Sequence, residues 1–156
     1  MTSSNTASNN TTSISMEHTT MNSTLTLTAQ DKATLRTAAY GAVSLLTAAG
    51  AAGGKPHRIA TDGSIALASV TGAVGHVLAE KPGAVKLDGK NVAAIADQVL
   101  PALTEAMSLL KRQDPAEADN FRSTVAVALQ AATHRCEPTP TMADMTRKIT
   151  SALDAA

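Results

Sequence analysis

The sequence predicts an all-α domain, a compact Ala-rich bundle of about five helices preceded by a disordered N-terminal tail. Three observations support this prediction: alanine dominates the apolar residues, apolar positions recur at helical spacing, and the first 25 residues are mostly Ser, Thr and Asn. Alanine is the strongest helix former, and a 3-4 spacing places side chains on one helix face. With no Trp, one Tyr and one Phe in 156 residues, the core must pack through small side chains.

The chain divides into a predicted tail over residues 1–25 and a helical domain over residues 26–156. The tail contains too few apolar residues to offset the entropy lost on ordering it. Met16 and Met21 are alternative translation starts within the tail. The remaining residues are numerous enough to bury one hydrophobic core.

Two of the helices have strong start signals. Thr28 and Asp31 match a capping box before a helix over residues 29–49, which the glycines that follow it end. Its apolar positions are Leu35, Ala38, Ala42, Leu45 and Ala49. Asp114 and Pro115 combine an acidic N-cap with proline at the first helical position, which predicts a helix over residues 115–134. The expected buried face of this helix is Phe121, Val125, Ala128 and Ala132.

A single helix is predicted over residues 57–80, ended by Lys81-Pro82-Gly83. Small residues recur every four positions at Ser64, Ala68 and Gly72, a pattern that lets another backbone approach. Glycine inside a helix costs up to about 1 kcal/mol relative to alanine, so close packing is the expected compensation. We therefore expect this helix to be the central one, and a larger side chain at Gly72 to overpack the contact.

The clearest amphipathic repeat predicts a helix over residues 89–112 with Asp88 as its N-cap. Its apolar face is Val92, Ile95, Val99, Leu103, Ala106 and Leu110. Pro101 lies inside this repeat and predicts a kink, because proline removes a backbone hydrogen-bond donor.

The last helix is predicted over residues 140–154, with Asp144 and Lys148 paired on its solvent side. One face carries Met142, Met145, Ile149 and Leu153. Methionines are adaptable contact residues, and a terminal helix is easily shared between protomers. The two methionines therefore mark the candidate surface for a two-fold dimer, although the same stripe also fits ordinary core packing.

Charge and composition exclude several function classes. Thirteen Lys and Arg balance thirteen Asp and Glu, so the chain lacks the positive field that favours nucleic acids or anionic membranes, and we expect neither partner. No apolar run reaches the roughly 20 residues of a membrane span. No secretory leader is recognisable, which makes the cytoplasm the expected location. Cys136 is the only cysteine and suits a reducing compartment.

Local motifs for catalysis or metal binding are absent from the sequence, so no catalytic residue, metal or cofactor is predicted. The weak candidates for ligand binding are His76, Arg122, Lys55, His57 and Arg58. His76 follows small residues on its helix, and together with Arg122 it would border a small pocket. An up-and-down helix order would place the cations of residues 55–58 at the same end as Lys111 and Arg112, where ordinary helix-end charges are the simpler interpretation.

The leading functional hypothesis is a non-enzymatic protein that acts through self-association or through binding to another protein. Small-residue stripes and the lack of a catalytic motif motivate it. The alternative is a helical domain that binds a small molecule or an anion at the candidate residues. An enzyme is the third hypothesis, because a catalytic site assembled from distant residues leaves no local trace in a sequence.

Deleting residues 1–24 is predicted to leave the melting temperature nearly unchanged, because the segment has no periodic apolar face that would dock on the domain. Thermal unfolding followed by circular dichroism on the full and truncated chains is the measurement. A midpoint lowered by several degrees in the truncated chain would show that the tail contributes to the folded state.

Overall fold

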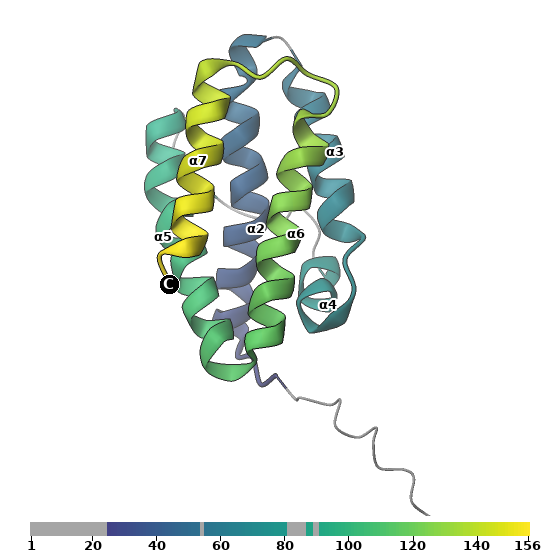
Figure 1. Ribbon diagram of the computed structural model, residues 1–156, viewed down its shortest axis with the longest axis vertical. Helices are drawn as coiled ribbons and strands as arrows, with labels where there is room; N and C mark the ends of the chain where they lie inside the picture. Colours follow the sequence, from purple (N-terminus) through teal and green to yellow (C-terminus); the bar gives the residue numbers. More distant parts are fainter. Residues whose placement is uncertain (1–24, 54, 81–86, 89–90) are drawn as a thin grey trace, which may run out of the picture.

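The computed structural model describes residues 25–53, 55–80, 87–88 and 91–156. This part of the chain forms an all-α bundle, as predicted, and contains no strand (Figure 1). Its elements in order are α2 (Ala29–Ala49), the short 3₁₀ helix η1 (Ala51–Gly53), α3 (Pro56–Ala68), α4 (Gly72–Glu80), α5 (Val92–Gln113), α6 (Pro115–Thr133) and α7 (Pro140–Asp154). Residues 1–24 of the predicted tail and the predicted stop at residues 81–83 lie outside the described residues.

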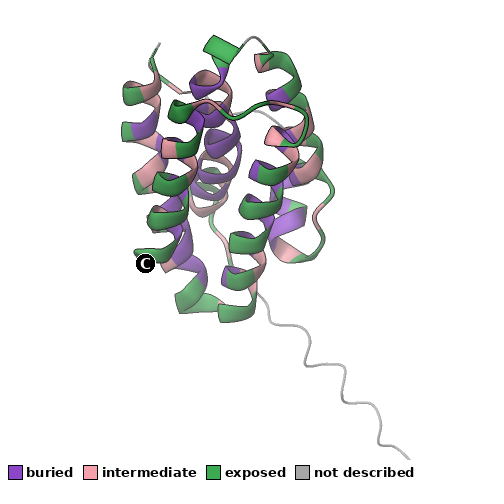
Figure 2. Ribbon diagram, turned by 45° about the horizontal axis from the view of Figure 1, so that its top comes forward, coloured by how far each residue is buried: buried purple, intermediate pink, exposed green. Residues whose placement is uncertain are grey.

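Helix α2 is the central helix and is buried on most of its surface (Figure 2). All five predicted core positions from Leu35 to Ala49 are buried, and so are Ala39, Tyr40 and Gly41 between them. A Cβ atom at Gly41 would lie 2.7 Å from Cγ2 of Val99, so the missing side chain lets α5 pack closely against α2. The central position was predicted for residues 57–80, and that prediction was wrong.

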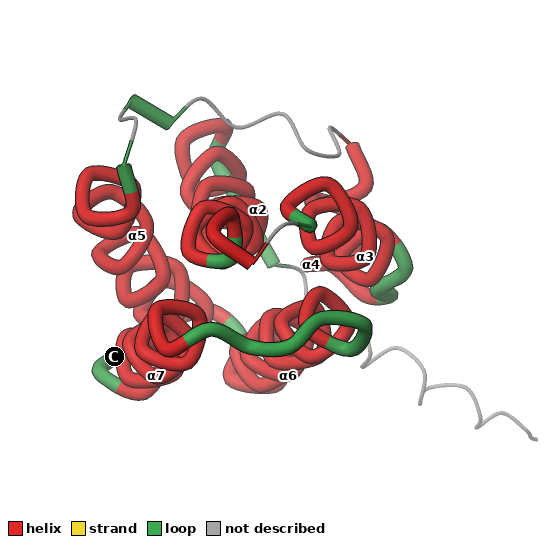
Figure 3. Tube along the Cα trace, turned by 90° about the horizontal axis from the view of Figure 1, so that it is seen from above, coloured by secondary structure: helices red, strands yellow, loops and turns green. Residues whose placement is uncertain are grey.

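The helices form two layers when the bundle is viewed along its axis (Figure 3). Helices α5, α2 and α3 lie in one layer, while α7 and α6 lie in the other. Thr26 N donates to Oε1 of Gln113 at 3.0 Å, which joins the end of α5 to the start of α2. Helix α5 is therefore antiparallel to α2 and runs in the same direction as α3 (Figure 1).

The three helices whose bounds were predicted best, α2, α6 and α7, each begin after a residue whose side chain caps the helix. Thr28 and Asp31 form the predicted capping box, with both hydrogen bonds at 3.0 Å. The carboxylate of Asp114 accepts from Ala116 N at the start of α6. Thr139 caps α7 by accepting from Met142 N at 3.1 Å. The predicted buried face of α6 is buried in full.

The predicted single helix over residues 57–80 is two helices, separated by Ser69, Val70 and Thr71. Gly72 has a φ of +86°, a left-handed conformation that side chains disfavour and glycine adopts readily. Ala68 and Gly72 are both exposed, so the stripe of small residues is not a close helix contact. A larger side chain at Gly72 would still be unfavourable, because of this backbone conformation and because its Cβ atom would lie 3.0 Å from Oε1 of Glu117.

Helix α4 has only nine residues, and neighbouring helices supply hydrogen bonds at both of its ends. Glu117 of α6 accepts from Val74 N at 3.2 Å in the first turn. Two side chains of α2 donate to the last turn: Nε of Arg36 to Val77 O at 3.2 Å, and the hydroxyl of Tyr40 to Leu78 O at 2.9 Å. These bonds satisfy groups that a helix leaves unpaired at its ends.

Helix α5 begins three residues later than predicted. Its N-cap is Asn91, whose side chain accepts from Ala94 N at 2.8 Å. The predicted cap, Asp88, instead donates its backbone N–H to Oε1 of Gln98 at 2.9 Å. The helix continues through Pro101, which is exposed.

Helix α5 is also long and apolar enough, by length and composition alone, to cross a membrane. In the structure its apolar face belongs to the core of the bundle, since Val99, Leu103, Ala106 and Leu110 are buried. The fold therefore gives these apolar side chains a packing role within the bundle.

Helix α7 has the predicted bounds, and Nζ of Lys148 lies 3.3 Å from Oδ2 of Asp144 as predicted. Its methionine stripe faces the core, with Met142 2% and Met145 6% exposed. These side chains fill gaps between helices and are not available to a second copy. The predicted dimer surface on this helix was therefore wrong.

The tight contact on α3 is at Gly63, where a Cβ atom would lie 2.7 Å from Cγ1 of Val43. Gly63→Leu is therefore predicted to lower the free energy of unfolding by about 1 to 3 kcal/mol through overpacking. The matched control is Ala68→Leu on the exposed side of the same helix, which should change it by less than about 0.5 kcal/mol. Urea denaturation of both variants gives the comparison, and equal effects would contradict the assignment of the buried face.

Candidate functional site

His76 lies on α4 with 80% of its side chain exposed, and its nearest charged partner is Glu80, at 3.7 Å between Nε2 and Oε1. Glu80 also pairs with two cations of α2: Lys32 at 3.5 Å and Arg36 at 2.5 Å. The carboxylate thus joins α4 to α2. His76 lines a hollow of about 550 Å³ beside Leu25, the first described residue.

Arg122 lies on α6 and forms an ion pair with Asp154 near the end of α7. Both side chains are about half-exposed. His76 thus has its charged partner on its own helix, whereas Arg122 has its partner on α7. The structure gives the two candidates different neighbours, and Arg122 does not line the hollow beside His76.

The two predicted basic clusters lie at opposite ends of the bundle. Lys111 donates from Nζ to Ala156 O at 2.7 Å, at the end of α5 that adjoins the start of α2. Lys55 precedes α3, just beyond the other end of α2, where His57 and Arg58 are also exposed. The predicted single basic end was wrong, because α5 runs in the same direction as α3 and ends beside the start of α2.

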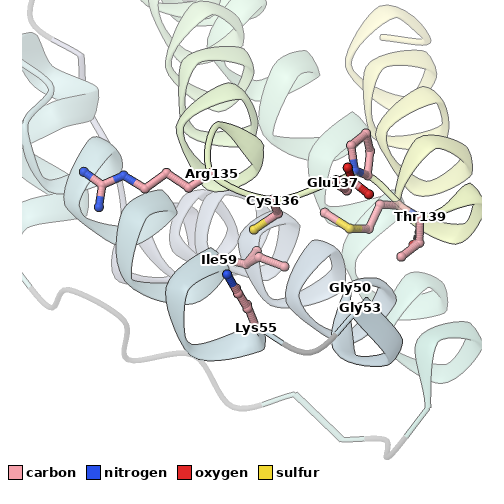
Figure 4. A pocket seen from close by; sticks show the side chains of 10 residues that line it. Gly50, Gly53, Lys55, Ile59, Arg135, Cys136, Glu137 and Thr139 are labelled. Atoms are coloured by element: carbon pink, nitrogen blue, oxygen red, sulfur yellow. Dashed lines mark hydrogen bonds between the residues drawn. The ribbon is translucent and has the colours of Figure 1, made fainter.

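A cavity of about 380 Å³ opens at the Lys55 end, between the α2–α3 and α6–α7 connections. We call it the loop cavity (Figure 4). Its lining residues are Gly50, Gly53, Lys55, Ile59, Arg135, Cys136, Glu137, Pro138, Thr139 and Met142. The hydroxyl of Thr139 donates to Ala49 O at 3.3 Å, which ties the two connections together.

Side chains of both charges line the loop cavity. The ammonium group of Lys55 lies near Cys136 and Ile59 in Figure 4, while the side chain of Arg135 extends outward from the rim. Glu137 lies on the α7 side. None of these three charged groups forms an ion pair with another residue that the structure describes.

A second candidate region is the outer side of α6 with its neighbours. Within the described ranges, the exposed large apolar side chains are Ile65 of α3, at 60%, and Val127 of α6, at 56%. One hollow of about 260 Å³ lies between α3 and α6, lined by Asp62, Ile65, Ala66, Ala131, His134 and Arg135. Another of about 270 Å³ lies between α6 and α7, lined by Ala126, Val127, Leu129, Gln130, Thr133, Thr146 and Thr150. We call the region spanned by these two hollows the α6 face.

Part of this geometry could have been found in the sequence. Val127 falls outside the predicted buried face of its helix, so it was recognisable as an exposed apolar residue. Ile65 was recognisable in the same way, because it falls outside the stripe that apolar residues form at helical spacing over residues 57–80, namely Ile59, Ala66, Val70, Ala73 and Val77. Arg135, Cys136 and Glu137 carry no such signal, because only the fold brings their connection to Lys55.

No family model, curated protein or solved structure matches the chain. Among the described residues, no group of three or more His, Cys, Asp or Glu side chains is placed to hold a metal ion. A functional argument therefore depends on the loop cavity and the α6 face themselves.

The pair between Arg122 and Asp154 is predicted to contribute little to stability, because water screens an exposed ion pair. Arg122→Met should lower the free energy of unfolding by less than about 1 kcal/mol, and Asp154→Asn should have a similarly small effect. Chemical denaturation of both single variants and the double variant measures the coupling. A coupling of several kcal/mol would show that the pair is a structural element of the bundle.

Proposed function

We propose that the protein functions by self-association, with a second copy docking on the α6 face. The observation that carries the proposal is the position of Ile65 and Val127. These two large apolar side chains are exposed on neighbouring helices, α3 and α6. Most of the other large apolar side chains that the structure describes are buried. Removing them from water would favour association, since buried apolar area is its main driving force.

The shape of the α6 face suits a helix of a second copy. The exposed residues between Ser123 and Ala131 carry no charge, and Ala126 and Ala131 leave room for a close approach. The two hollows run along either side of α6. Helices pack by inserting the side chains of one into such grooves on another.

Charge at the edge of the face favours a second copy over a strongly charged partner. The hollow between α3 and α6 has Asp62 together with His134 and Arg135. A two-fold axis would bring Asp62 of one protomer toward Arg135 of the other, as a self-complementary interface requires. The formal net charge is zero, so long-range repulsion between copies is absent.

Sedimentation equilibrium on the full chain at tens of micromolar is predicted to give a dimer, and Val127→Arg to give a monomer. An arginine at this position would place one charge from each protomer inside the interface, which is costly without a partner. The matched control is Ala93→Arg, an exposed position on α5, in the other layer. It should leave the dimer intact.

Two results would overturn the proposal. A monomer mass for the unchanged protein in this concentration range would reject self-association. A dimer that resists Val127→Arg and Ile65→Arg would reject the α6 face as the interface. Circular dichroism on each variant confirms that the helical fold is retained before the masses are compared.

A further inference from the structure

We propose that the two-fold axis of the dimer passes through the hollow between α3 and α6, and that a reciprocal ion pair between Asp62 and Arg135 selects a second copy as the partner. This inference rests on the proposed self-association and specifies how one copy recognises the other. The hollow of about 260 Å³ has two walls. Its α3 wall is Asp62, Ile65 and Ala66, and its α6 wall, which continues just past the end of that helix, is Ala131, His134 and Arg135.

The two walls carry opposite charges. Asp62 is a partly buried acid on the α3 wall. Arg135 is exposed on the α6 wall, and its side chain extends outward from the molecule (Figure 4). Although both residues line one hollow, they form no ion pair with each other or with any other residue that the structure describes. Both charges are therefore available to a second molecule.

This distribution of charge indicates where the axis passes. A half-turn about an axis through the hollow places the α6 wall of one copy over the α3 wall of the other. Asp62 of each protomer then faces the partner's Arg135, so the contact occurs twice, as in any two-fold interface. The hollow on the other side of α6 offers no such pairing, because no charged residue lines it.

The same half-turn gives Ile65 a position in the interface. Its side chain is 60% exposed on the α3 wall, and the rotation brings it over the partner's Ala131, whose small side chain leaves room for it. Val127 lies one turn before Ala131 on α6, and both line a continuous shallow hollow with Gln130 and His134. The contact can therefore extend along α6 and cover both exposed apolar residues.

Reciprocal pairing makes the interface selective for a second copy. Complementary charges across an interface determine which partner binds more than they add to the affinity. A partner with one sign of charge would match one wall of the hollow and be repelled by the other. A second copy of this chain presents the matching charge to both walls at once.

The test reverses the two charges one at a time. Asp62→Arg leaves two cations in the hollow and Arg135→Asp leaves two acids, so each homodimer would bring like charges together. Sedimentation equilibrium should show that the dissociation constant of each homodimer is raised by about tenfold or more. An equimolar mixture of the two variants should restore the dimer, because their charges match at both contacts. Native mass spectrometry identifies the heterodimer by its intermediate mass.

The matched controls are Glu105→Arg and Arg112→Asp, at exposed positions of α5, which lines neither hollow of the α6 face. They change the net charge by the same amounts as the two test variants. Each control should dimerise as well as the unchanged protein, which separates the local ion pair from overall repulsion. Circular dichroism verifies the helical fold of all four variants.

The outcomes distinguish this inference from the proposed function. Homodimers that persist in both test variants, or a mixture that stays monomeric although the unchanged protein dimerises, would overturn the position of the axis and leave self-association standing. A monomer mass for the unchanged protein would reject both proposals. A heterodimer formed only on mixing supports the reciprocal pair, because an ion pair within one chain could not produce it.

Discussion

The close packing around α2 is the constraint on which the rest of the bundle depends. Helices from both layers contact α2, and its eleven buried residues include four alanines and Gly41. Small side chains let neighbouring backbones approach, but each buries little apolar area. Stability must therefore come from many close contacts, such as those that Gly41 makes with Val99 and Gly63 makes with Val43. Cores of this kind have little space to absorb a larger side chain.

The same packing explains where the candidate sites lie. Methionines and leucines fill the spaces between helices, so Met142 and Met145 are used inside the fold. The two candidate regions are the outer side of α6 and the junction where two connections meet beyond the end of α2. Neither location required a specialised fold. The loop cavity lies where helices begin and end, whereas the α6 face lies along the side of α6 that the other helices leave uncovered.

The sequence was informative wherever a helix is determined by its own residues. The bounds of α2 and α7 follow from local caps and apolar spacing, and α6 differs from its prediction by a single residue. The break before Gly72 was missed because residues 43 to 49 positions away complete it: Glu117 accepts from Val74 N, and the side chain of Asn120 donates to Thr71 O. Periodicity alone cannot report such contacts.

The sites were harder to predict than the helices for a related reason. Lys55 was recognised as a candidate, yet the prediction grouped it with Lys111 because it assumed that consecutive helices alternate in direction. Helix α5 instead runs in the same direction as α3 and ends beside the start of α2. The loop cavity joins two connections that are about 80 residues apart in the chain, and no local pattern links them.

Helix α4 has a consequence for the order in which the chain acquires its structure. An isolated helix shorter than about 12 residues is only marginally formed in water, and α4 has nine. One of its stabilising partners, Glu117, follows Val74 by 43 residues. During synthesis on the ribosome, α4 therefore emerges well before the residue that caps it. It is completed only when α6 docks beside α2, so its amide protection reports on the assembly of the whole bundle.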